Sequence, residues 1–207
     1  MIKGIYVITD PYLASGRGHI DITQAALCGG AAIIQLRDKT ASDKDLLPVA
    51  REMQRLCKES GALFIVNDRV DVALLCGAGG IHVGQSDHPA GELRRLFEGK
   101  ILGVSAGTEE EAKAAAQAGA DYIGVGPIFA TTTKKDAGPV LCKDEMERIK
   151  CAAGGIPVVA IGGITRENLA EVAALGVESA AVISAVVASP NMEEATRRLV
   201  QIWQASN

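Results

Sequence analysis

The sequence predicts an α/β protein, a single-domain (β/α)8 barrel that spans residues 1–207. Short apolar segments alternate with helix-like segments with a period of roughly 25 residues, which is typical of parallel strands joined by helices. Eight such units fit in the chain without a linker or a change of composition between them. A doubly wound open sheet is the alternative. Its dinucleotide-binding form is disfavoured because no GxGxxG motif follows the first strand.

Each predicted strand is a short, mainly apolar run, as expected for strands buried in a parallel sheet. In chain order these strands are Gly4–Thr9, Ala31–Leu36, Leu63–Val66, Gly80–Val83, Ile101–Val104, Tyr122–Val125, Val158–Ile161 and Ala180–Ile183. The clearest helical patterns between and after them are Ser42–Ser60, Thr108–Ala118, Arg166–Leu175 and Met192–Ala205. Residues suited to begin or end helices flank these segments: Ser42 or Asp43, Thr108, Gly61, Gly119 and Gly176.

The composition excludes several classes of protein. A net charge of −4 argues against a basic surface for nucleic acid, and no apolar run is long enough to span a membrane. The N-terminus enters a strand-like run directly and lacks the cleavage site of a secretory signal. The five cysteines are an odd number without CxxC spacing, which favours reduced, buried thiols in a cytoplasmic protein.

Polar residues follow nearly every predicted strand, at the end that faces the active site of such a barrel. In and after the second predicted strand, the alternation of side chains puts Gln35, Arg37 and Lys39 on one face. The opposite face carries Ile34, Leu36 and Asp38. Two cations on one face predict a phosphate-bearing ligand, because unpaired burial would destabilise them. The alternative is a salt-bridged strand end, with Asp38 or a neighbouring helix as the counterion.

Two carboxylates, Asp68 and Asp87, follow the third and fourth strands. Mg²⁺ prefers such hard oxygen ligands together with substrate phosphates, so a magnesium site is predicted. The alternative for each aspartate is to cap the following helix. No histidine has metal-ligand spacing, and His82 is expected to be a hydrogen-bonded residue of the barrel.

Two anion sites are predicted. Arg37, Lys39 and Lys134 would form the first. The second comprises the Gly162-Gly163 turn with Ile183-Ser184, after strands seven and eight, where this fold usually binds phosphate. A simple strand-to-helix turn is the alternative for the glycines. The segment from Thr131 towards Val140 lacks periodicity, and its hydroxyls and lysines suit a lid over phosphates or a solvated loop.

A set of motifs in this order resembles the thiamine-phosphate synthase family along essentially the whole chain. The motifs are QLRDK at 35–39, NDR at 67–69, GIHVGQSD at 80–87, GVS at 103–105, GPIFATTTKKD at 126–136, GGI at 162–164 and VIS at 182–184. The resemblance implies a (β/α)8 barrel and condensation of 4-amino-5-hydroxymethyl-2-methylpyrimidine diphosphate with hydroxyethylthiazole phosphate. Thiamine phosphate and pyrophosphate would be the products.

The resemblance also implies roles for individual residues. Contacts to the pyrimidine diphosphate would come from Gln35, Arg37, Lys39 and Asn67. The thiazole phosphate would be held by Thr131, Thr133, Gly163, Ile183 and Ser184. Asp68 and Asp87 would bind Mg²⁺ as the cofactor, and the catalytic set would be Lys134 near the pyrophosphate, Ser105 near the reacting centre and Arg37. The expected partners are small phosphorylated molecules, without nucleic acid or membrane, and a homo-oligomer is left open.

Other functions compete with this interpretation. Many family members have proline at Ala130 and histidine at Gly107, which puts loop rigidity and a supporting contact in doubt. A thiazole tautomerase would carry a catalytic histidine in place of part of the GPIF segment, and Gly126-Pro127 argues against it. A phosphosugar isomerase or aldolase would need a base or a Schiff-base lysine, for which Lys39 is the candidate. A non-catalytic barrel that binds thiamine precursors is the third alternative.

Overall fold

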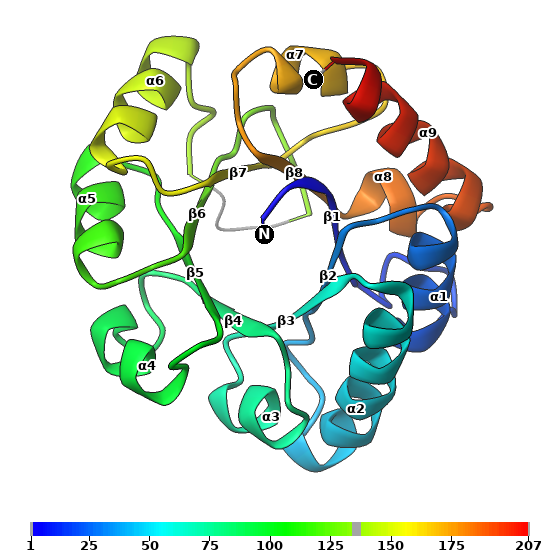
Figure 1. Ribbon diagram of the computed structural model, residues 1–207. Coiled ribbons are helices and arrows are strands. Elements are labelled where there is room, and N and C mark those ends of the chain that lie inside the picture. Colours follow the sequence, from blue (N-terminus) through cyan, green and yellow to red (C-terminus); the bar gives the residue numbers. More distant parts are fainter. Residues whose placement is uncertain (1, 134–137, 207) are drawn as a thin grey trace.

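The computed structural model describes residues 2–133 and 138–206. Eight parallel strands close into a barrel in sequential order, and a ring of helices surrounds it (Figure 1). The strands are β1 Gly4–Ile8, β2 Ile33–Leu36, β3 Leu63–Asn67, β4 Gly80–Val83, β5 Ile101–Ser105, β6 Tyr122–Val125, β7 Val158–Ile161 and β8 Ser179–Val182. The barrel is closed by pairing of β1 with β8, so the predicted fold is confirmed and the open sheet is excluded.

The helices follow the strands in the order expected for this fold. They are α1 His19–Cys28, α2 Asp43–Ser60, α3 Val70–Leu75, α4 Ala90–Leu96, α5 Glu109–Gln117, α6 Lys143–Ala152, α7 Leu169–Ala173, α8 Ser184–Val187 and α9 Met192–Ser206. The predicted helix Arg166–Leu175 was too long, because Thr165 and Asn168 form a hydrogen-bonded turn before α7 begins. The Ser42 cap is confirmed, since its hydroxyl accepts a hydrogen bond from Asp45 N.

Side-chain alternation along the strands creates two separate cores. Outward residues of the strands pack against the helices, and Val7, Ile34, Phe64 and Ile81 belong to this larger core. Inward residues such as Tyr6, Ile33 and Tyr122 fill the barrel itself. Both faces of every strand are therefore buried, which explains why the strands are continuous apolar runs in the sequence.

The burial of the cysteines tests the expectation of reduced, buried thiols. The prediction of buried thiols is confirmed for Cys57 and Cys76, but it was wrong for Cys28, Cys142 and Cys151, which are exposed. Burial raises the pKa of the Cys57 thiol to about 12, so this thiol is inert at neutral pH.

Among residues 2–133 and 138–206, no helix is long and apolar enough to span a membrane.

Candidate active site

The end of β2 carries the first group of predicted site residues. Gln35 is buried and points into the barrel, where its Nε2 donates a hydrogen bond to Tyr6 Oη at 2.7 Å. Ile34 belongs to the outer core, so the predicted alternation of faces is confirmed for the strand. The strand itself ends at Leu36, and Arg37 and Lys39 lie in the turn that follows it.

Asp38 does not neutralise Arg37 or Lys39. One of its oxygens accepts hydrogen bonds from the backbone N–H groups of Thr40 and Ala41, both at 2.8 Å. The other lies 3.1 Å from Nε2 of the buried His19. Neither Arg37 nor Lys39 forms a salt bridge in the described part of the chain, so the alternative of a strand end salt-bridged through Asp38 is not what the structure shows.

His19 joins three elements at this end of the barrel. Its Nδ1 lies 2.7 Å from the hydroxyl of Thr9 after β1, and its Nε2 faces Asp38 after β2. Burial lowers the pKa of His19, against the opposing effect of Asp38. Burial alone would raise the pKa of Asp38, but the N–H groups of Ala41 and Thr40 and the His19 ring hold it well below its usual value. The arrangement anchors the turn that carries Arg37 and Lys39.

We expect replacement of His19 by leucine to lower the free energy of unfolding by about 2 kcal/mol, because Thr9 and Asp38 lose buried partners. The folded pKa of His19 lies below its unfolded value of 6.5, so acidification protonates the unfolded chain first. The wild type should therefore lose stability relative to His19→Leu as the pH falls below about 6.5. Urea unfolding at several pH values measures both effects, with the exposed His88→Gln as control. Equal stability of His19→Leu and wild type would contradict the anchoring role.

Asp68 and Asp87 lie together at the ends of β3 and β4. Asp68 has a left-handed backbone, with φ of 59°, and its N–H donates to His82 O at 2.9 Å. Neither aspartate is the N-cap of a helix, because the N-cap residues that precede α3 and α4 are Arg69 and Pro89. Burial and then the hydrogen-bonded Asp87 carboxyl raise the pKa of Asp68 to about 6, while Asn67 and Lys39 act in the opposite direction.

Two adjoining carboxylates suit a divalent cation. Burial and the neighbouring Asp87 raise the pKa of Asp68 more than Asn67 and Lys39 lower it, so the folded protein favours a protonated Asp68 more than the unfolded chain does, unless a cation is bound beside it. No cluster of three or more His, Cys, Asp or Glu side chains suited to a metal occurs among the described residues. A cation held here would therefore take its remaining ligands from water or from a bound phosphate, as Mg²⁺ commonly does.

The predicted phosphate-binding segments come together between β6 and β8. After β6 the chain runs beside the end of β7, with hydrogen bonds from Ile128 N to Ile161 O and from Phe129 N to Gly162 O, both at 3.0 Å. A Cβ at Gly163 would lie 2.5 Å from Ala130 O, and its φ is 63°, so only glycine fits this approach. Thr131 and Gly163 are thereby neighbours in space.

Ile183 and Ser184 complete this side of the barrel mouth. Ile183 precedes the short helix α8, which begins at Ser184 directly after β8. The backbone N–H groups at this start come before the first intrahelical bond, from Val186 N to Ile183 O at 3.0 Å. Thr133 N donates to the Thr131 hydroxyl at 3.2 Å, which shapes the chain before Lys134. Lys134, and with it the centre of the predicted lid, lies outside the described residues.

Ser105, at the end of β5, forms hydrogen bonds with His82 and Gln85. Its hydroxyl lies 3.0 Å from His82 Nε2, and its carbonyl accepts a hydrogen bond from Gln85 Nε2 at 2.6 Å. The expectation of a hydrogen-bonded His82 is confirmed. Sequence reasoning missed Tyr6 and Tyr122, whose hydroxyls lie 3.1 Å apart inside the barrel. The signal available was two tyrosines in apolar strands of a chain with only 3% aromatic residues.

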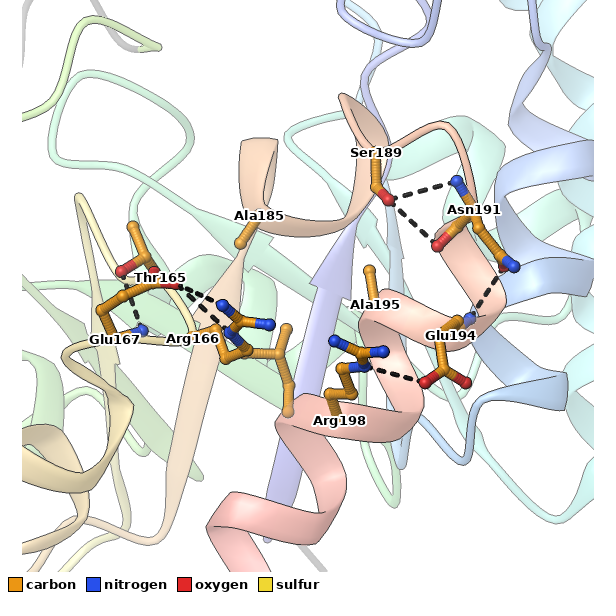
Figure 2. A pocket seen from close by; sticks show the side chains of 10 residues that line it. Thr165, Arg166, Glu167, Ala185, Ser189, Asn191, Glu194, Ala195 and Arg198 are labelled. Atoms are coloured by element: carbon orange, nitrogen blue, oxygen red, sulfur yellow. Dashed lines mark hydrogen bonds and ion pairs between the residues drawn. The ribbon is translucent and has the colours of Figure 1, made fainter.

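Two hollows of the surface lie next to the barrel mouth, and only the second is lined by a predicted site residue, Asp68. One, of about 330 Å³, lies against α8 and α9, and Figure 2 shows Arg166 and Arg198 on it. Glu167 and Glu194 pair with these arginines, so the hollow has little free charge for an anion. A second, of about 440 Å³, lies between α3 and α4 and reaches Asp68.

Comparisons with known proteins agree with the geometry of this barrel. The family model described as thiamine monophosphate synthase matches residues 5–186. The thiamine-phosphate synthase of Methanoregula boonei is 50% identical over 94% of this chain and 90% of its own, and that of Methanospirillum hungatei is 47% identical over 96% and 97%. The solved thiamine phosphate pyrophosphorylase of Pyrococcus furiosus superposes with a TM-score of 0.91, at 38% identity over 98% of this chain and 96% of that one.

Proposed function

The chain belongs to the thiamine monophosphate synthase family, and from this premise we propose how the residues at the barrel mouth carry out the family's reaction. It is a transferase of thiamine biosynthesis that condenses the pyrimidine diphosphate with the thiazole phosphate and releases pyrophosphate. The five free cysteines support a location in a reducing compartment, the cytoplasm.

One observation supports the assignment of residues more than any other. The turn that carries Arg37 and Lys39 follows β2, which pairs with β3, and Lys39 is close enough to Asp68 after β3 to lower the pKa of that carboxyl. Two carboxylates that can hold a metal ion, beside two cations that form no salt bridge with a described residue, together suit a diphosphate with its metal ion. We assign Gln35, Arg37, Lys39 and Asn67 to the pyrimidine diphosphate on this ground.

The thiazole phosphate is assigned to the other side of the mouth. Thr131, Thr133, Gly163, Ile183 and Ser184 offer hydroxyl and backbone N–H groups between β6 and β8, where this fold usually binds phosphate. The two substrates would then approach each other above the centre of the barrel. Ser105, between the two groups, would lie near the reacting carbon.

The chemistry requires charge stabilisation rather than proton transfer. The attacking thiazole nitrogen carries no proton, so no general base is needed. Departure of pyrophosphate leaves positive charge on the pyrimidine methylene and negative charge on the leaving group. Arg37 and Lys39 would stabilise the developing negative charge by hydrogen bonds directed at the phosphate oxygens. Mg²⁺ held by Asp68 and Asp87 would supply further positive charge to the same oxygens.

Product formation tests the function directly. Purified protein incubated with both substrates and Mg²⁺ should yield equal amounts of thiamine phosphate and pyrophosphate, and neither product when one substrate is omitted. Folded protein that forms no product would contradict the proposal. An aldolase-like function would instead give a covalent adduct at Lys39 upon reduction with borohydride in the presence of a carbonyl substrate, and we expect none.

Lys134 is proposed to act on the departing pyrophosphate. Replacing it by alanine should reduce the single-turnover rate by about 100-fold, because the positive charge that stabilises the leaving group is lost, while binding of the thiazole phosphate changes little. Rapid-quench kinetics and calorimetric titration measure the two quantities. The exposed Lys143→Ala, at the start of α6, is a matched control. A normal single-turnover rate in Lys134→Ala would leave this lysine as part of a solvated loop.

A further inference from the structure

Five polar side chains form one continuous chain of hydrogen bonds across the barrel interior. Gln35 Nε2 donates to Tyr6 Oη at 2.7 Å, and Tyr6 Oη lies 3.1 Å from Tyr122 Oη. Tyr122 Oη lies 2.9 Å from His82 Nδ1, and His82 Nε2 lies 3.0 Å from Ser105 Oγ. The chain thus joins β2 to β5 through β1, β6 and β4. Its two ends, Gln35 and Ser105, are both residues proposed to face the pyrimidine.

The barrel is built to make room for this chain. A Cβ at Gly103 on β5 would lie 2.1 Å from Tyr122 Cζ, so the glycine leaves the space that the tyrosine ring occupies. A Cβ at Gly124 on β6 would lie 3.1 Å from His82 Cε1. The His82 and Tyr122 rings stack with centroids 5.4 Å apart, and Tyr6 meets Tyr122 edge-on at 6.3 Å. The rings therefore have little freedom to separate.

In this series of hydrogen bonds, each side chain donates to the next in the same direction, from Gln35 to Ser105. Burial raises the pKa of both Tyr6 and Tyr122 above the usual value, so each hydroxyl stays neutral and has a single proton. Tyr6 accepts from Gln35, and Tyr122 Oη is the acceptor within reach for its own proton, so we orient the series with Tyr6 donating to Tyr122 and Tyr122 donating to His82 Nδ1. The proton of the neutral imidazole is then on Nε2, which donates to Ser105 Oγ.

The direction of these hydrogen bonds determines which hydrogen-bonding groups remain available at Gln35 and Ser105. Gln35 uses its amide N–H inside the barrel, so its carbonyl oxygen, Oε1, remains as an acceptor with no partner among the described residues. Ser105 Oγ accepts from His82, so its own proton is available to donate. The barrel mouth therefore carries an acceptor on the β2 side and a donor on the β5 side.

We propose that Tyr6, Tyr122 and His82 are positioning residues that determine which pyrimidine is accepted, by fixing the hydrogen-bond direction at Gln35 and Ser105. The proposal rests on the proposed function. A 4-aminopyrimidine is complementary: its amino group donates to Gln35 Oε1 and a ring nitrogen accepts from the Ser105 hydroxyl. The 4-oxo counterpart places an oxygen opposite Oε1 and a protonated ring nitrogen nearby, so both of its groups meet the wrong partner.

Removing one hydroxyl from the middle of the chain tests this inference. Tyr122→Phe keeps the ring but removes the donor to His82 Nδ1, so the imidazole proton can move and the Ser105 hydroxyl can reverse. The ratio of kcat/KM for the 4-amino diphosphate to that for the 4-oxo diphosphate should fall by about tenfold or more, since sites that hydrogen-bond a substrate reject mismatched analogues strongly. A merely structural role would lower both values by the same factor.

Tyr6→Phe provides a second variant, which frees the Gln35 amide to rotate and should also reduce the selectivity. Tyr12→Phe is the matched control, because Tyr12 is 71% exposed and lies outside the chain. Nitrogen-15 NMR of labelled histidine in the wild type gives a readout independent of turnover: His82 should carry its proton on Nε2 alone. A proton on Nδ1, or on both nitrogens at neutral pH, would overturn the inference.

The outcomes separate the two proposals. A wild-type protein that forms no thiamine phosphate contradicts the proposed function, and the histidine tautomer then still reports on the chain. A wild type that forms product while Tyr122→Phe and Tyr6→Phe keep its selectivity overturns the inference alone. Thermal unfolding of each variant shows whether a loss of activity reflects a loss of fold.

Discussion

Asparagine in place of Asp68 should reduce turnover by about 1,000-fold, and asparagine in place of Asp87 should have an effect of the same order. Each change removes one negative charge from the pair at the ends of β3 and β4 while keeping the shape of the side chain. The remaining single carboxylate would hold a divalent cation weakly, and the charge on the departing pyrophosphate would be less well stabilised. Titration of activity with Mg²⁺ should show a large increase in the concentration needed for half-maximal rate.

Asparagine is the informative substitution at Asp68 because of its backbone. With φ of 59°, residue 68 is in the left-handed region, which asparagine tolerates nearly as well as glycine and alanine does not. At position 87 the asparagine oxygen can still accept the hydrogen bond from Gly84 N, at 2.7 Å in the wild type. Both variants should thus keep their thermal stability, and Asp144→Asn on the exposed face of α6 serves as control. Full activity of both variants in chelator-treated buffer would refute the magnesium assignment.

Replacement of Arg37 by methionine should reduce kcat/KM for the pyrimidine diphosphate by about 100-fold or more. Methionine keeps much of the apolar length of the side chain and removes the guanidinium, whose planar N–H groups can bind two phosphate oxygens at once. Arg37→Lys should recover only part of the loss, because an ammonium is a point charge without that geometry. Initial rates at varied pyrimidine diphosphate measure the effect.

The control for Arg37 is an arginine of α2 that lies outside the barrel mouth. Arg55 is half exposed and pairs with Glu52 and Glu59, so Arg55→Met should leave the kinetic constants unchanged. Direct binding of the pyrimidine diphosphate to Arg37→Met, followed by calorimetry, separates affinity from rate. Unchanged affinity in this variant would show that Arg37 does not face the diphosphate.

The strands and their faces could be predicted from local pattern because alternation is a property of a single strand. Ile34 and Gln35 lie on opposite faces of β2 whatever surrounds them, and polar residues after the strands meet at one end because all the strands are parallel. Element ends were less predictable. The helix before Leu175 begins only at Leu169, because a side-chain turn at Asn168 competes with helical hydrogen bonds.

The sequence by itself determined the barrel, the position of its mouth and the residue types that gather there. The partners of those residues were decided only by the tertiary structure. Asp38 could have neutralised Arg37, but the packing of α1 brings His19 to it instead. Tyr6 and Tyr122 come from strands that are not neighbours in the sheet, and their contact depends on how the closed barrel staggers its strands. Periodicity describes one strand at a time, so contacts across the barrel follow from its closure.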